Sequence, residues 1–260
     1  MAFRNLILDQ RGGICRITIH RPDKLNALNR ETIGELALAF EQARQDDGVR
    51  VVVVAGSGEK AFIAGADIGE LAGLSPLEAQ RFSRAGQELM LDIERLGKPV
   101  IARIQGFALG GGMELAMSCH LRIASENARF GQPEINLGVI PGFGGTQRLL
   151  RLCGRGAALE LCLLGHQIDA ARAYALGAVT RVVAAEKLDG EVDALATQLA
   201  NSAPHALAGI LDAIVTGGEC GIDAGLDYET QAFALCCSSA DMREGTRAFL
   251  ERRKPAFTGN

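Results

Sequence analysis

The sequence predicts an α/β fold that ends in a purely helical region. Strand and helix patterns alternate over the first two-thirds of the chain, as in a sheet covered by helices. Residues 49–56 are a continuous apolar run, which is typical of a strand buried on both faces. Beyond about residue 186 only helical spacing remains, and no low-complexity linker intervenes. We therefore expect an α/β core over residues 1–190 and a helical region over residues 191–260.

The first half of the core carries clear signals for each element. Residues 14–19 alternate and are rich in β-branched side chains, which predicts a strand. Residues 31–43 place apolar side chains at helical spacing. Ser75 and Glu78 have the spacing of a capping box, with proline at the first helical position, and begin the next long helix. A strand is expected to follow over residues 99–106.

The remaining elements are shorter. Helices are expected over residues 111–118, from Thr146 onward and over residues 169–177, and strands over residues 121–124 and 179–183. The helical region has two apolar stripes, Leu188, Val192, Leu195 and Leu199, then Leu207, Ile210, Leu211 and Ile214. Asp241 and Glu244 have the spacing of a capping box for the last helix, which holds Phe249 and Leu250.

Composition argues against several classes of function. The net charge is −4 and no block of like charges occurs, so binding to nucleic acid or to a membrane surface is not expected. The start of the chain lacks the features of a signal peptide, and no apolar run approaches the ~18 residues of a membrane span. The seven cysteines are odd in number and include no CxxC pair. We expect reduced thiols in a cytoplasmic protein, and no metal site.

Glycine-dense segments follow the predicted strands at residues 55–67, 106–115 and 141–149. In the second, Gly110-Gly111-Gly112 precedes a helix whose first-turn N–H groups lack partners and carry the positive end of the dipole. Such groups can stabilise negative charge that develops on an oxygen, and Glu114 stands in the same turn. The alternative is a tight packing turn with Glu114 as a surface charge.

Two further features can complete a reactive site. The first segment offers more N–H donors around Ala66, although a simple surface turn is the favoured explanation when this segment is viewed alone. Glu134 stands beside Pro133 and Ile135, and partial burial there would raise its pKa. Two converging carboxyl groups are suited to moving protons to and from a substrate. The alternative is an ion pair or a loop cap at Glu134, and spacing alone does not decide whether it meets Glu114.

Other motifs are weaker. Residues 56–61 match G-x-G-x-x-A after a strand, but no clean helix follows, and the acidic residue about twenty positions on lies in a helix cap, so a dinucleotide site is not expected. No P-loop, G-x-S-x-G or H-E-x-x-H motif occurs. His120 follows Cys119 without a third group to complete a nucleophilic site, which favours a packed or solvent-facing histidine.

Taken together, the chain resembles the crotonase (enoyl-CoA hydratase/isomerase) family over almost its whole length. The resemblance is carried by HRPDKLNALN (20–29), KAFIAGADI (60–68), IQGFALGGGMELAMSC (104–119), FGQPEINLGVIPGFGGTQRL (130–149) and REGTRAFLERRKPAF (243–257). It implies a spiral of ββα units with a helical C-terminal trimerisation region, assembled as a trimer or a dimer of trimers. Gly69 and His120 depart from the family, which often has a charged residue and an aspartate at these positions.

The resemblance also implies roles for individual residues. Glu114 and Glu134 match the two catalytic glutamates, and the N–H groups of Ala66 and Gly111 match the oxyanion hole for the thioester oxygen. The acyl-CoA pocket is expected to include Leu25, Ala27, Lys60, Ala64, Asp67, Ile68, Phe107, Leu109, Pro133 and Gly142. Phe233, Phe249 and Arg252 match positions that help to bind the CoA nucleotide, often across a subunit boundary. Lys60, Arg252, Arg253 and Lys254 are candidates for a local basic patch.

The activity implied is hydration of a 2-enoyl-CoA, with Glu114 activating the water and Glu134 protonating the α-carbon. Coenzyme A is then part of the substrate, and no separate cofactor is required. Enoyl-CoA isomerisation or another chemistry of the family is the alternative, since many isomerases keep only the group that matches Glu134. RNA binding without catalysis is disfavoured by the net charge and by the presence of both glutamates.

Overall fold

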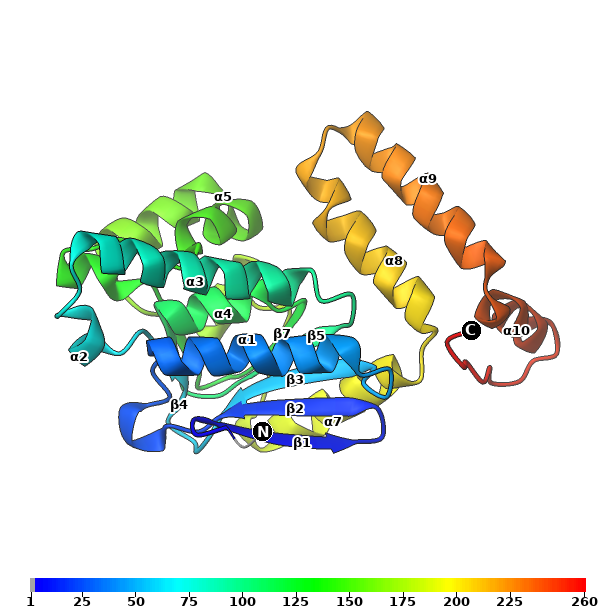
Figure 1. The fold of residues 1–260 in the computed structure, drawn as a ribbon, viewed down its shortest axis with the longest axis horizontal. Helices are drawn as coiled ribbons and strands as arrows, with labels where there is room; N and C mark the ends of the chain where they lie inside the picture. Colours follow the sequence, from blue (N-terminus) through cyan, green and yellow to red (C-terminus); the bar gives the residue numbers. More distant parts are fainter. Residues whose placement is uncertain (1–2) are drawn as a thin grey trace.

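A six-stranded sheet runs through the body of the protein in the order β1-β2-β3-β5-β7-β10 (Figure 1). The structure is a computed structural model and describes residues 3–260. The strands of this sheet are β1 (Leu6–Arg11), β2 (Ile14–Ile19), β3 (Val51–Gly56), β5 (Val100–Ile104), β7 (Leu121–Ser125) and β10 (Arg181–Val183). Only the β1–β2 pair is antiparallel among these strands, and the others pair in parallel.

Burial on both faces explains the continuous apolar run of β3. Successive side chains of a strand point to opposite faces. Val52 and Val54 belong to the main core under the long helices, whereas Val51 and Val53 pack with Leu188, Val192 and Ala196 on the other face. The predicted two-sided burial of this strand is confirmed. The helix that covers the second face is α7 (Leu188–Ala200), so the expected boundary at residue 190 lies inside a helix that packs on the sheet.

A second, smaller sheet has the order β4-β6-β8-β9. Its strands are β4 (Ala61–Ala64), β6 (Phe107–Leu109), β8 (Arg129–Gly131) and β9 (Ile168–Asp169). Strands β4, β6 and β8 follow β3, β5 and β7 in the chain, and each pair leads into helical structure. This repeated β-β-α order is the spiral that the resemblance implied. The sequence patterns did not predict the small sheet, because its strands have two to four residues.

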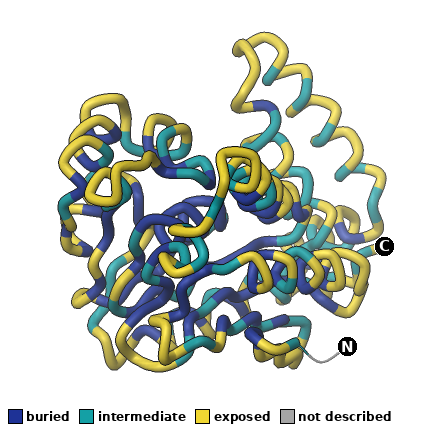
Figure 2. Tube along the Cα trace, turned by 60° about the vertical axis from the view of Figure 1, so that its left-hand side comes forward, coloured by how far each residue is buried: buried dark blue, intermediate teal, exposed yellow. Residues whose placement is uncertain are grey.

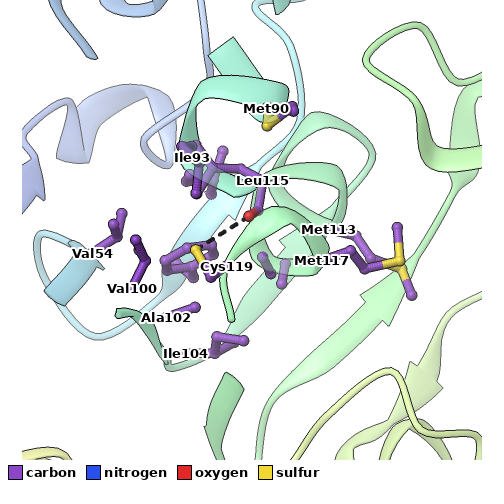
Figure 3. Packing of buried hydrophobic residues seen from close by; sticks show 14 of the residues in the cluster. Val54, Met90, Ile93, Val100, Ala102, Ile104, Met113, Leu115, Met117 and Cys119 are labelled. Atoms are coloured by element: carbon purple, nitrogen blue, oxygen red, sulfur yellow. Dashed lines mark hydrogen bonds between the residues drawn. The ribbon is translucent and has the colours of Figure 1, made fainter. Parts of the chain in front are cut away.

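Most of the helices cover the larger sheet. The helices of the body are α1 (Arg30–Gln45), α2 (Ile68–Leu71), α3 (Pro76–Glu94), α4 (Gly111–Ser118), α5 (Gly145–Leu164) and α6 (Ala170–Ala175), with short 3-10 turns η1 (Pro22–Lys24), η2 (Pro133–Leu137) and η3 (Ala185–Lys187), whereas η4 (Gly217–Glu219) lies in the C-terminal helical region. The predicted capping box at the start of α3 is present in both directions. Every residue of α4 is buried, and Figure 3 shows its Met113, Leu115 and Met117 among core side chains from α3 and β5.

The last three helices project from the body as an arm, α8 (Pro204–Val215), α9 (Ile222–Ser238) and α10 (Ala240–Leu250) (Figure 1). Figure 2 shows this arm as largely exposed or half-buried, in contrast with the dark interior of the body. Ile210 and Ile214 of the predicted stripe are 55% and 70% exposed, so one chain does not cover this face. No helix in residues 3–260 is long and apolar enough to cross a bilayer.

The predicted capping box of the last helix is wrong. Ser239 is the N-cap, and its side chain accepts a hydrogen bond from Met242 N. Asp241 is buried, and its carboxylate accepts hydrogen bonds from the backbone N–H groups of Thr258 and Gly259. The side chain therefore fastens the tail of the chain against α10, which is a long-range contact that helix spacing does not reveal.

Candidate active site

Three segments of the candidate site leave the small sheet at the same edge. Strands β4, β6 and β8 are parallel neighbours, with Ala64 paired to Leu109 and Leu109 paired to Gly131. Ala66, Gly111 and Glu134 follow these strands by only two or three residues. Because parallel strands present their carboxyl ends at one edge, the topology brings the three segments together. The three glycine-rich or acidic segments that the sequence singled out thus belong to one site.

Glycine is required where the oxyanion segments approach each other. Gly110 has φ of 49°, in the region that side chains disfavour, and a Cβ there would lie 2.7 Å from Glu134 Oε1. A Cβ on Gly112 would lie 2.0 Å from the carbonyl oxygen of Ile63. Close packing of α4 against β4 therefore accounts for the third glycine, and the left-handed turn into α4 accounts for the first.

The N–H groups of Ala66 and Gly111 are available as donors. Neither donates a hydrogen bond to another group in residues 3–260, whereas their neighbours Asp67 and Gly110 donate to Leu28 O and Gly131 O. Gly111 is the first residue of α4, where the helix dipole adds to its donor strength. Two such groups on adjacent segments can hold one oxygen that becomes negatively charged.

Glu114 is an inward-facing side chain of α4 and is 1% exposed. Its Oε1 accepts hydrogen bonds from the backbone N–H groups of Phe143 at 2.8 Å and Gly145 at 2.6 Å. Gly145 is the first residue of α5, so the carboxylate also lies at the positive end of that helix. No described residue donates to Oε2. The alternative of a surface charge at Glu114 is thus wrong, and one of its oxygens remains free for chemistry.

Glu134 lies in the first turn of η2 and is half-buried. Its carboxylate rests against Gly110. With its amide nitrogen facing these acceptors, Gln132 reaches both carboxylate oxygens at 3.0 Å. The same amide lies beside Gly145, next to the Glu114 carboxylate. Gln132 is fully buried between the two acidic groups, and no local pattern in the sequence predicts a role for it.

Burial changes the proton affinity of both carboxyl groups. Loss of solvation, followed by the negative charge of Glu134, raises the pKa of Glu114 to about 7, against the opposing effect of its two N–H donors. Loss of solvation also raises the pKa of Glu134 to about 7. Two neighbouring carboxyls of this kind share protons and titrate as a pair. Near neutral pH one can hold a proton while the other is ionised, which is what acid–base chemistry requires.

The early loop is attached to the first oxyanion segment. Leu28 N donates to Gly65 O, and Asp67 N donates to Leu28 O, so the two segments pair as strands do. The Asp67 carboxylate accepts a hydrogen bond from Arg21 at 2.9 Å and caps α2 through Gly69 N. Asp67 was expected to line the acyl-CoA pocket, and its carboxylate is already committed to these two contacts.

The other expected pocket residues lie at both ends of the small sheet: Ala64 and Leu109 end β4 and β6, whereas Lys60 and Phe107 lie at the opposite, amino ends of these strands. Leu25, Ile68 and Phe107 are large apolar side chains that are 38%, 51% and 37% exposed. Lys60 is exposed immediately before β4. The more enclosed members of the set are Ala27, Ala64, Leu109, Pro133 and Gly142. Exposed apolar side chains beside two donor groups provide the kind of surface that a ligand with an apolar chain would cover.

The three C-terminal residues are not part of this site within one chain. Phe233 on α9 and Phe249 on α10 are 71% and 82% exposed, and both helices lie at the opposite end of the molecule from β4 and α2 (Figure 1). Arg253 is held by Glu244 at 2.6 Å and Glu251 at 2.7 Å. Lys60 lies beside β4, at the opposite end of the molecule from α10. Within one chain it therefore does not form a single basic patch with the arginines that follow α10.

His120 has a structural role. Its Nδ1 accepts a hydrogen bond from Val100 N at 2.9 Å, and its Nε2 lies 3.0 Å from Glu94 O. The ring therefore joins β5 to the end of α3, as expected for a packed histidine. The segment after Gly56 forms the strand β4 rather than a helix, so it lacks the helix N-terminus that a dinucleotide fold needs.

Comparison with known proteins identifies relatives of this chain. The family model described as enoyl-CoA hydratase/isomerase matches residues 9–260. A short-chain-enoyl-CoA hydratase of Clostridium acetobutylicum is 44% identical over 254 residues, covering 98% of this chain and 97% of that protein. A crotonyl-CoA hydratase of Syntrophomonas wolfei is 44% identical over 257 residues, covering 99% of each.

Solved structures show the same fold. An enoyl-CoA hydratase structure from Bacillus anthracis has a TM-score of 0.95 at 37% identity, covering 99% of this chain and 100% of that one. A Geobacillus kaustophilus structure has a TM-score of 0.97 at 34% identity, covering 100% of this chain and 98% of that one. The crotonase-type fold expected from the resemblance is confirmed, and this chain belongs to the enoyl-CoA hydratase/isomerase family.

Proposed function

We propose that this protein is an enoyl-CoA hydratase that adds water across the 2,3-double bond of a trans-2-enoyl-CoA to give a 3-hydroxyacyl-CoA. One observation carries the proposal. Glu114 and Glu134, both with a pKa raised to about 7, flank one site beside the free N–H groups of Ala66 and Gly111. The relatives named as short-chain-enoyl-CoA and crotonyl-CoA hydratases support a short acyl chain.

The thioester oxygen would accept hydrogen bonds from Ala66 N and Gly111 N. These donors draw electron density from the conjugated double bond, so the β-carbon becomes open to attack by water. They then stabilise the enolate oxygen that forms. Each well-aimed donor contributes about 3–4 kcal/mol to the transition state. Coenzyme A enters as part of the substrate, and the proposed reaction needs no separate cofactor.

The hydrogen-bond pattern supports a division of labour between the glutamates. Glu114 accepts two backbone N–H groups at Oε1, which favours its ionised form and leaves Oε2 to take a proton from water. As the water oxygen bonds to the β-carbon, Glu134 gives its proton to the α-carbon. The pair begins with Glu134 protonated and Glu114 ionised, and ends with the proton on Glu114. Exchange with solvent restores the starting state.

We also propose that the protein assembles as a trimer or a dimer of trimers in the cytoplasm. The apolar side chains exposed on α8, α9 and α10, including Ile214, Phe233 and Phe249, would be buried against neighbouring copies. In such an assembly Phe249 and Arg252 would reach the CoA site of an adjacent subunit. Multi-angle light scattering of the purified protein measures the mass directly, and a monomer would contradict the proposal.

The test is the loss of enoyl thioester absorbance with crotonyl-CoA. We expect Glu114→Gln and Glu134→Gln to reduce kcat by several orders of magnitude while both variants stay folded. Glu88→Gln removes one exposed charge from α3 and is expected to leave kcat unchanged. If Glu114→Gln retains full activity, or if the wild type is inert on crotonyl-CoA and on longer substrates, the two-glutamate hydratase is wrong. Enoyl-CoA isomerisation through Glu134 alone is then the reaction to assay.

A further inference from the structure

The loop over residues 142–145, which holds Glu114, is itself held by α3. Gly142 O accepts hydrogen bonds from Ser83 Oγ at 2.6 Å and from Gln87 Nε2 at 3.0 Å. The Phe143 ring packs edge-on against Phe82 with 5.2 Å between centroids. Gly86 provides the space for that ring, because a Cβ there would lie 2.1 Å from it. The loop is therefore attached to the body at its first residue and through its aromatic side chain.

An ion pair fixes the other side of the same loop. Arg148, on the first turns of α5, donates from Nε to Glu94 Oε1 at 2.7 Å and from Nη2 to Glu94 Oε2 at 3.0 Å. Its remaining nitrogen, Nη1, donates to Phe143 O at 2.9 Å. The two side chains are only 11% and 23% exposed, so water competes weakly for these bonds. Gly144 is needed here as well, since a Cβ on it would lie 2.2 Å from Nη1.

Arg148 is thus bonded to the carbonyl of the residue whose N–H holds Glu114. The path runs from Glu94 at the end of α3, through the guanidinium to Phe143, and from Phe143 N to Oε1. A planar guanidinium with two bonds to one carboxylate has one fixed orientation. The third bond then fixes the peptide that follows Phe143, which leads to Gly144 and to the second donor, Gly145.

We propose that the Glu94–Arg148 pair is a positioning device that aims the Phe143 and Gly145 N–H groups at Oε1 of Glu114 and so leaves Oε2 directed at the reacting water. Arg148 is a positioning residue, because it acts on the substrate only through this loop. The inference rests on the proposed hydration reaction for its effect on turnover. Its effect on the ionisation of Glu114 does not depend on that reaction.

The charges around Glu114 predict the direction of that effect. The ionisable groups that act on Glu114 are Glu134 from η2 and Arg148 from α5, and the thiol of Cys162 on α5 feels the charge of Glu114 in turn. Glu134 disfavours the ionised form of Glu114, whereas Arg148 and the two N–H donors favour it. Removing Arg148 removes a positive charge and loosens both donors. The pKa of Glu114 should therefore rise further, and the acid limb of the kcat profile should move to higher pH.

The experiment compares Arg148→Met, Arg148→Lys and Glu94→Gln by kcat, KM and pH profile on crotonyl-CoA. We expect Arg148→Met to lower kcat by about 100-fold with little change in KM, as for other misplaced catalytic groups. Arg148→Lys should restore part of the loss, since an ammonium keeps the charge but not the paired bonds. Glu94→Gln is the milder variant if Arg148→Met does not fold. Arg103→Met breaks an ion pair with Asp189 elsewhere in the body and is expected to leave kcat and the acid limb unchanged.

Two results would overturn the inference. A folded Arg148→Met protein with the kcat and acid limb of the wild type would show that the pair does not position Glu114. A loss of kcat that leaves the ionisation of Glu114 unmoved would reduce Arg148 to a structural role. That ionisation can be followed without turnover, from the pH dependence of unfolding with and without Glu114→Gln. If the wild type does not hydrate enoyl-CoA, the proposed function fails while this second measurement still tests the pair.

Discussion

Replacing Glu114 with glutamine should make the protein more stable at pH 8 while abolishing turnover. The buried carboxyl must ionise in the folded protein above a pKa of about 7, whereas in the unfolded chain it ionises above its ordinary value of 4.5. A raised carboxyl pKa means that folding is favoured while the group is protonated. The stability that the protonated carboxyl contributes is fully present below pH 4.5. It falls as the pH rises from 4.5 and is lost once the pH has passed 7.

The size of the effect follows from that difference. At pH 8 the ionised carboxyl costs the folded state on the order of 3 kcal/mol relative to a neutral group, and at pH 5 about 1 kcal/mol. Glutamine is neutral and keeps one oxygen to accept the N–H groups of Phe143 and Gly145, so it avoids this penalty. We therefore expect Glu114→Gln to gain about 3 kcal/mol at pH 8 and about 1 kcal/mol at pH 5.

Urea unfolding at several pH values, at one protein concentration, measures these differences. Glu88→Gln is the control for removing a negative charge, because Glu88 lies exposed on α3. A Glu114→Gln protein that is no more stable than the wild type at pH 8, or whose gain is the same at pH 5, would contradict this expectation. Either result would mean that burial does not penalise the ionised form. A confirmed gain would show that the site is maintained at the expense of stability.

Three further substitutions test the packing around the site and the tail. Gly112→Ala should abolish folding, because its Cβ would lie 2.0 Å from a carbonyl of β4, whereas Gly156→Ala on α5 meets nothing within 4 Å and should not lower the melting temperature. Asn26→Ala should cost on the order of 3 kcal/mol, since it removes buried hydrogen bonds to the backbone at a residue with φ of 59°, and an unchanged urea midpoint would contradict this. Asp241→Asn should weaken the attachment of residues 258–259, and faster trypsin cleavage after Arg253 would reveal it.

Local patterns in the sequence were sufficient for the parts of the fold that depend on neighbouring residues. The capping box of Ser75 and Glu78, the two-sided burial of β3 and the helix over residues 111–118 all follow from spacing within a few residues. The capping box at Asp241 failed because a carboxylate of the right spacing was used instead for a contact seventeen residues away. The spacing of residues along the sequence shows which hydrogen bonds a side chain can make. Tertiary packing decides which of these bonds forms.

The candidate site illustrates the same division. The sequence marked Glu114, Glu134 and the segments around Ala66 and Gly111 as candidates, and the resemblance to the family assigned their roles, because each feature alone also had a structural explanation. It gave no role to Gln132 or Arg148, although both stand inside the segments that carry the family resemblance. Neither residue has a local pattern, since an amide or guanidinium gains its function only from the partners that the fold brings to it.

By itself the sequence determined the class of fold, the family and the chemical groups at the site. Only the tertiary structure decided that Glu114 and Glu134 meet, because this depends on β6 and β8 lying side by side in parallel. It also decided that Oε1 of Glu114 is occupied while Oε2 is free, and that α10, which carries Phe249, lies far from the site of its own chain. The physical reason is the distance along the chain over which each contact acts. The periodicity of side chains predicts contacts within one helix or strand, whereas the meeting of distant segments depends on strand order and packing.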